Sequence, residues 1–107
     1  MDSNKVSLCT RIMEKAFMYL MHNGSFSSQQ KLMNSLHSLV FCMANKYNLT
    51  KDDQGFCLYV FWNEYNKGCE TPMSDSHIRR TLIPAIFSMG KIDIPLGTSI
   101  LMMVERN

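Results

Sequence analysis

The chain has 107 residues, of which 46% are hydrophobic and 19% charged, and its formal net charge is +2. This length is expected to form one domain, and the apolar content is that of a globular protein and not of a disordered one. General binders of nucleic acid or of anionic membranes carry a strong basic excess, which is absent here. No apolar run approaches the roughly 20 residues of a membrane helix. The N-terminus lacks a signal-peptide pattern, so the sequence predicts an intracellular, cytoplasmic protein.

The charge is distributed unevenly along the chain. Residues 1–51 carry a net charge of +4, and residues 52–107 carry −2. The segment 52–75 has a net charge of −4 and also contains the only tryptophan and two of the four tyrosines. Such a composition is typical of a protein-binding surface, because carboxylates steer a basic partner and aromatic side chains anchor it.

Two helices are predicted in the first half. Hydrophobic residues at positions 9, 12, 13, 16, 17, 20 and 21 follow the spacing of an amphipathic helix, and Asn23 with Gly24 predicts its end. A second helix is predicted from Ser27, which forms a capping box with Gln30, and its apolar stripe continues to Tyr47. The connection between them is short, so we expect two antiparallel neighbours.

The third element centres on an uninterrupted apolar run from Phe56 to Trp62. Periodicity alone does not distinguish a buried strand from a helix that is buried on several sides. A capping box of Thr50 and Asp53, and a polar continuation to Gly68, favour a helix of about four turns. We expect this helix to be the central one of a bundle.

A fourth helix follows a loop over residues 68–73. It is predicted to begin between Pro72 and Asp75, with Ser74 or Asp75 as its cap, and to end at Gly90. Pro84 lies inside it and is expected to kink it, because proline has no backbone donor and clashes with the preceding turn.

Residues 91–107 fit two structures. Ile92 and Ile94 alternate with polar residues as in a β-hairpin, whereas a short last helix capped by Thr98 fits nearly as well. The predicted fold is therefore a mainly α, compact four- to five-helix bundle in a single domain, with a small C-terminal β-hairpin as one option for its end.

The sequence contains no recognisable catalytic or metal-binding motif. Its three histidines are scattered, and it has no nucleophile elbow, phosphate-binding loop or dinucleotide fingerprint. The four cysteines are isolated, which indicates free thiols, because zinc ligands usually come in close pairs. We therefore expect a protein that is not an enzyme and that uses neither a metal nor another cofactor.

The favoured hypothesis is a non-catalytic protein-binding domain. It would be a small inhibitor or immunity (antitoxin-type) protein that masks a basic partner, such as a nuclease toxin, through an acidic and aromatic surface. The predicted partner-binding residues are Asp52, Asp53, Tyr59, Trp62, Glu64, Tyr65 and Glu70.

The alternative hypothesis is a small nucleic-acid-binding transcriptional regulator with a winged-helix-like C-terminal half. The start of the fourth helix would contact bases and phosphates, and the C-terminal hairpin would be the wing. Glu70 and Asp75 flank this region and weigh against phosphate binding. The residues predicted to bind nucleic acid in this case are Ser76, His77, Arg79 and Arg80.

Overall fold

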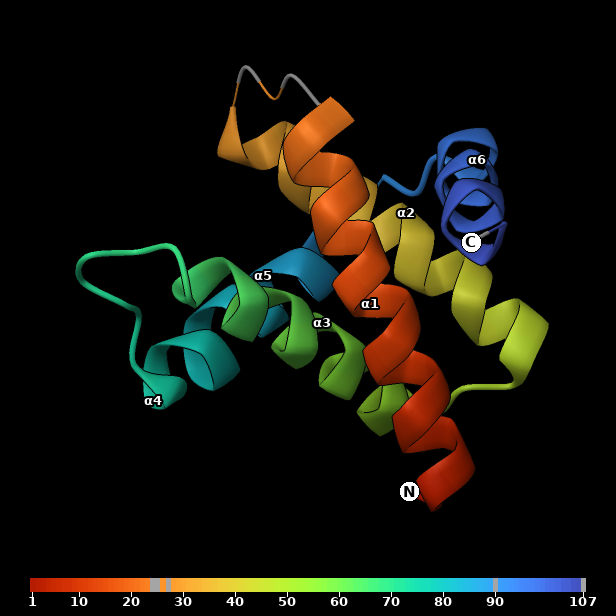
Figure 1. Ribbon diagram of the computed structural model, residues 1–107, viewed down its shortest axis with the longest axis horizontal. Coiled ribbons are helices and arrows are strands. Elements are labelled where there is room, and N and C mark those ends of the chain that lie inside the picture. The colour runs from red at the N-terminus through yellow and green to blue at the C-terminus, as the bar shows by residue number, and fades with distance from the viewer. Residues whose placement is uncertain (24–25, 27, 90, 107) are drawn as a thin grey trace.

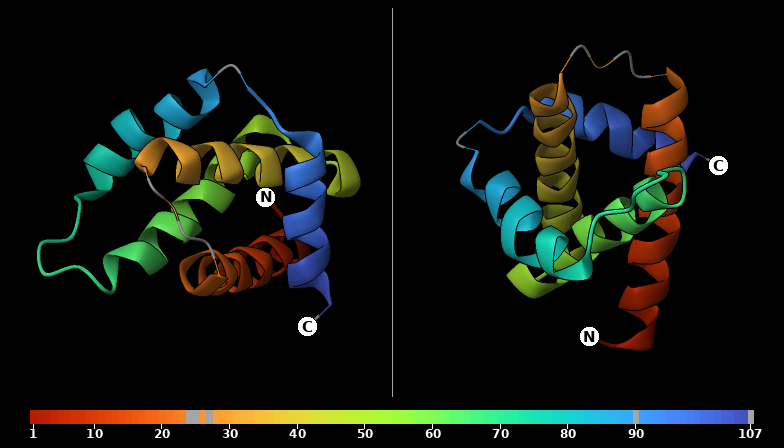
Figure 2. Two further views of the ribbon diagram at one scale, coloured as in Figure 1. Left: turned by 90° about the horizontal axis from the view of Figure 1, so that it is seen from above. Right: turned by 90° about the vertical axis from the view of Figure 1, so that its left-hand side faces the viewer.

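The computed structural model describes residues 1–23, 26, 28–89 and 91–106, and within these ranges it contains helices and no strand (Figure 1). The elements in chain order are α1 (Ser3–Asn23), α2 (Gln29–Tyr47), α3 (Lys51–Asn66), α4 (Asp75–His77), the π-helical turn η1 (Ile78–Leu82), α5 (Ile83–Ser88) and α6 (Ile94–Glu105). α1 packs mainly on α3, and α6 packs mainly on α2 (Figure 2). The predicted mainly helical, compact fold is confirmed, but the expectation that the first two helices pack as neighbours is wrong, because within the described residues α1 and α2 each pack on α3 and α6 and not on each other.

The described ends of α2 are set by a local hydrogen bond and by backbone conformation. α1 ends at Asn23 as predicted. α2 is capped by Ser28, whose Oγ accepts the N–H of Lys31 at 3.2 Å. The predicted stop at Gly24 and the predicted cap Ser27 lie outside the described residues. At its C-terminal end α2 is closed by a residue in the left-handed region, Asn48, with φ 55°.

The apolar run 56–62 is helical, and the predicted capping box of α3 is confirmed. Thr50 Oγ1 accepts the N–H of Asp53 at 3.1 Å, and Asp53 Oδ2 accepts the N–H of Thr50 at 3.0 Å. One face of α3 enters the core, where Phe61 meets Phe17 of α1 edge-on with 5.5 Å between ring centroids. α3 contacts α1, α2, α5 and η1, as expected of a central helix. Its buried apolar residues are Cys57, Leu58, Phe61 and Trp62.

α4, η1 and α5 follow one another without a break, and the turn before Pro84 is widened. Ser74 caps this segment, with its Oγ accepting the N–H of His77 at 3.0 Å. In η1 the N–H of Ile83 reaches the carbonyl of Ile78, five residues back. Proline cannot supply the usual bond to the preceding turn, and a π turn is one way for a helix to accommodate that loss. The disturbance predicted at Pro84 thus takes the form of a π turn immediately before it.

Residues 94–105 form a helix, so the option of a C-terminal β-hairpin is wrong. α6 also begins one turn before the helix predicted from Thr98, because Asp93 is its cap. The carboxylate of Asp93 accepts the N–H of Leu96 at 3.0 Å, and Pro95 lies in the first turn, where its missing donor costs nothing. Without the hairpin, the winged-helix-like half has no wing within residues 91–106.

α6 is held against α2 at both of its ends. At its start a Cβ on Gly97 would lie 2.3 Å from the carbonyl oxygen of Ser38, so only glycine permits this close approach. At its end Lys46 Nζ lies 2.7 Å from a carboxylate oxygen of Glu105. None of the described helices is long and apolar enough to span a membrane.

Candidate functional site

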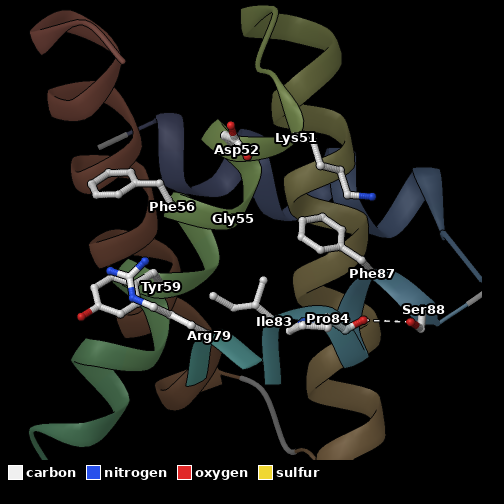
Figure 3. Close-up of a pocket in the computed structure, with 10 residues that line it drawn as sticks. All are labelled: Lys51, Asp52, Gly55, Phe56, Tyr59, Arg79, Ile83, Pro84, Phe87 and Ser88. Atoms are coloured by element: carbon white, nitrogen blue, oxygen red, sulfur yellow. Dashed lines mark hydrogen bonds between the residues drawn. The ribbon is translucent and has the colours of Figure 1, made fainter. Parts of the chain in front are cut away.

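An open groove of about 680 Å³ lies between α3 and α5 (Figure 3). This volume is within the range of about 300–1,000 Å³ that is typical of ligand-binding pockets. We call it the aromatic groove, because three of its lining residues are aromatic. It is lined by Lys51, Asp52, Gly55, Phe56, Tyr59, Arg79, Ile83, Pro84, Phe87 and Ser88.

Arg79 is fixed at one end of the aromatic groove. Its guanidinium carbon lies 4.1 Å from the centroid of the Tyr59 ring, and its Nε donates to Asp75 Oδ2 at 2.9 Å. The Tyr59 hydroxyl donates to the other carboxylate oxygen of Asp75. This bond, together with that from Arg79, holds the pKa of Asp75 below its usual value. The three side chains therefore position one another, and the cation lies on the ring face that favours it.

Lys51 occupies the other end of the groove. Its Nζ lies 4.3 Å from the centroid of the Phe87 ring, away from the Tyr59–Arg79 pair (Figure 3). The Phe87 ring meets His37 of α2 at a right angle, with 6.1 Å between centroids. Burial lowers the pKa of His37, against the opposing effect of a hydrogen bond to the Met89 backbone. The neutral imidazole of His37 thus packs against the Phe87 ring, on which Lys51 lies.

Gly55 leaves the backbone of α3 open at the groove. A Cβ at this position would have no other atom within 4 Å, so nothing described in the structure requires a glycine there. Glycine in a helix interior costs about 0.5–1 kcal/mol relative to alanine. The missing side chain leaves room for another molecule to approach the helix closely.

Two of the predicted partner-binding residues, Asp53 and Trp62, are buried. Asp53 is 5% exposed and Trp62 is 1% exposed. Asp53 caps α3 and lies 3.2 Å from Lys5 Nζ; its hydrogen bond from the Thr50 backbone, and that from Lys5, lower its pKa. The Trp62 ring packs at 5.4 Å from both Phe61 and Tyr65. These two side chains hold the fold together and do not reach the surface as partner anchors.

The other predicted partner-binding residues do not form one surface. Asp52 and Tyr59 line the aromatic groove. Glu64 is partly buried and pairs with Lys67 at 2.9 Å, while Tyr65 lines a separate depression near the end of α1 and the start of α2. Glu70 is exposed in the loop before α4. Because successive helical residues point about 100° apart, acids and aromatics that are adjacent in sequence face different neighbours.

The residues predicted to bind nucleic acid, Ser76, His77, Arg79 and Arg80, are all exposed on α4 and η1. They share a short helical surface, but Arg79 is held by Asp75 and Tyr59. The structure therefore places Arg79, a predicted nucleic-acid-binding residue, in the same groove as Asp52 and Tyr59, two predicted partner-binding residues.

Sequence reasoning missed Lys51, Gly55, Phe56 and Phe87 as members of the site. The helical period contains a partial signal for the α3 wall, because Asp52, Phe56 and Tyr59 recur at spacings of four and three. No sequence pattern indicates that α5 lies opposite this face.

No group of three histidine, cysteine or acidic side chains within the described residues is placed to hold a metal ion. Comparisons with protein-family models, curated proteins and solved structures find no match for this chain.

Proposed function

We propose that this protein is a non-catalytic binding protein of the inhibitor or immunity type, which takes a segment of a partner protein into the aromatic groove. The observation that carries this proposal is the placement of Arg79 on Tyr59 and of Lys51 on Phe87. Tyrosine, arginine and other aromatic side chains are enriched in protein interfaces. Side chains that are already ordered lose less conformational entropy when a partner binds.

The chemistry of the aromatic groove fits a partner segment that is apolar and carries a basic residue. Its cations already lie over aromatic rings, and Arg79 is also paired with Asp75. Asp52 is exposed and, within the described residues, its carboxylate has no hydrogen-bond or ion-pair partner. We therefore keep a basic partner, such as a nuclease toxin, in the proposal. The carboxylate of Asp52 would pair with a basic residue of that partner.

The nucleic-acid alternative has less support. Its wing is replaced by α6, and the charge of Arg79 is compensated by Asp75. Arg80 alone is a weak basis for polyanion binding, because such affinity depends on several phosphate contacts.

The test is capture of a partner from the source cells with the wild-type protein and with Gly55→Leu. Leucine at position 55 fills the groove, and the fold is expected to tolerate it because a Cβ there meets no other atom. The matched control is Gly68→Leu, at an exposed turn where a Cβ has only an ordinary contact at 3.9 Å. Circular dichroism melting verifies that both variants fold.

The proposal predicts that a protein captured by the wild type and by Gly68→Leu is lost with Gly55→Leu. Asp52→Lys is expected to weaken the same capture through charge repulsion. Capture that is unaffected by Gly55→Leu contradicts the proposal. Retention of nucleic acid alone, falling steeply with salt and abolished by Arg79→Ala with Arg80→Ala, supports the regulator instead.

A further inference from the structure

A second groove of about 850 Å³ lies between the first half of α2 and the segment 91–96. This groove, which we call the aliphatic groove, shares no lining residue with the aromatic groove. Its volume is within the range of small-molecule sites. The lining residues are Phe26, Lys31, Asn34, Ser35, Ser38, Lys91, Ile92, Asp93, Ile94, Pro95 and Leu96.

One wall of the aliphatic groove is apolar and partly open to solvent. Ile94 is 55% exposed and Leu96 is 37% exposed, and Ile92, Pro95 and Phe26 line the groove with them. Each Å² of apolar surface removed from water contributes about 25 cal/mol. A contiguous group of exposed apolar side chains therefore favours an apolar ligand at this position.

The described charged residues of the aliphatic groove are two lysines and one aspartate, so positive charge is in excess. Asp93 is the only acid among the described residues that line it, and its carboxylate accepts the N–H of Leu96 at the start of α6. The Ser38 hydroxyl accepts the N–H of Asp93 at 2.8 Å. Neither Lys31 nor Lys91 has an ion-pair partner within the described residues. The first turn of α2 contains no acidic residue, so its amide dipoles add to the positive field.

We propose that the aliphatic groove binds a free anionic amphiphile, a single-chain molecule with a carboxylate head such as a long-chain fatty acid. Lys31 and Lys91 bind the carboxylate, and the alkyl chain covers Ile92, Ile94 and Leu96. Lys31 lies two helical turns from Ser38, about 10 Å along α2, so the first part of an alkyl chain can lie between these two residues. This inference is independent of the function proposed for the aromatic groove.

The experiment is a calorimetric titration of the intact protein with dodecanoate below its micelle-forming concentration. The wild type is expected to bind one equivalent. Lys31→Gln combined with Lys91→Gln weakens binding at least about tenfold, because charge-assisted bonds to the carboxylate are lost. The matched control, Arg11→Gln with Lys67→Gln, removes the same charge outside both grooves and leaves the affinity within about twofold. Dodecyltrimethylammonium, which has the same chain and the opposite charge, does not bind.

Amide NMR locates the ligand. Dodecanoate is expected to shift the amides of Ser35, Ile92, Asp93, Ile94 and Leu96 and to leave that of Gly55 unchanged, and Gly55→Leu retains the wild-type affinity. This last result separates the present inference from the function proposed above.

Several results overturn the inference. They are equal affinity for dodecanoate in the double lysine variant, equal binding of the cationic detergent, and shifts confined to the aromatic groove. Co-sedimentation with phosphatidylglycerol vesicles without binding of free dodecanoate assigns the groove to a lipid surface instead. A dimer that is dissociated by Ile94→Lys and that excludes dodecanoate assigns it to a second copy of the chain.

Discussion

The aromatic and aliphatic grooves contain the same charges, two cations and one carboxylate each, yet they differ in what those charges contact. In the aromatic groove Lys51 and Arg79 lie over rings, and the carboxylate of Asp52 is the group without a partner among the described residues. In the aliphatic groove the carboxylate of Asp93 caps α6. Within the described residues, Lys31 and Lys91 have no ion-pair partner.

The difference shows that net charge does not define the ligand chemistry of a groove. A cation over a ring is partly compensated, whereas a lysine beside aliphatic side chains is compensated by water alone. The first arrangement suits an apolar segment with a basic group, and the second suits an apolar chain with an acidic group. The following changes alter one groove and leave the other intact.

The largest expected effect comes from Gly97→Ala. The added Cβ would lie 2.3 Å from the Ser38 carbonyl oxygen, so α6 must move away from α2 and the wall of the aliphatic groove moves with it. We expect the free energy of unfolding to fall by about 3 kcal/mol, at the upper end of overpacking costs. Urea denaturation measures this loss. An unchanged midpoint would show that α6 does not approach α2 this closely.

Acidification is expected to weaken the support of the aromatic groove through His37. Its pKa is lowered by burial from the ordinary value of 6.5, so the unfolded chain takes up the proton first as the pH falls through 6.5. The contribution of neutral His37 to the free energy of unfolding is then fully present above pH 6.5. It decreases as the pH falls from 6.5 to the folded-state pKa, by no more than about 1.4 kcal/mol per pH unit. Urea denaturation between pH 7.5 and 5.5 measures this decrease.

Replacement of His37 separates this effect from other titrations. His37→Gln should remove most of the pH dependence between 7.5 and 5.5. His22→Gln with His77→Gln, at two exposed histidines, should retain it. The opposite pattern would assign the dependence to the surface.

Gly55→Ala is expected to stabilise the protein by about 0.5–1 kcal/mol, because alanine is the better helix former and the added Cβ meets no other atom. Replacement by alanine is therefore expected to raise the free energy of unfolding at Gly55 and to lower it at Gly97. Thermal melting measures the gain. A loss of stability would mean that another part of the chain packs against Gly55.

The smallest effect on stability is expected from Asp75→Asn, since exposed ion pairs contribute little to folding. Its effect on the aromatic groove is larger, because Arg79 is released from the Tyr59 ring. Loss of the ring-current shift on the Arg79 side-chain protons, together with stronger retention on heparin, would show this release. Unchanged Arg79 shifts would mean that the ring alone holds the guanidinium.

The helices and their caps were predictable to the extent that short-range chemistry decides them. The Thr50–Asp53 capping box requires only residues three positions apart, and it is present in the structure. The sequence left the C-terminus open between a hairpin and a helix, because Ile92 and Ile94 alternate with polar residues over a short stretch only. The Asp93 cap and the packing of Gly97 on Ser38 define a helix there.

The candidate site was less predictable than the fold. Asp52 and Tyr59 were identified from composition and do line a groove, but Asp53 and Trp62 share that composition and are buried. Composition reports that a segment is acidic and aromatic, and it does not report which side chains of a helix face solvent.

The sequence by itself determined the helical class, three of the helix starts or ends and the absence of recognised catalytic motifs, because these depend on spacing and on residues close in the chain. Only the tertiary structure decided that Arg79 lies on Tyr59, that Lys51 lies on Phe87, and that Asp93 of segment 91–96 is hydrogen-bonded to Ser38 in the middle of α2. Each of these contacts joins residues that are far apart in the sequence. Their geometry follows from how the helices pack, which local propensity does not specify.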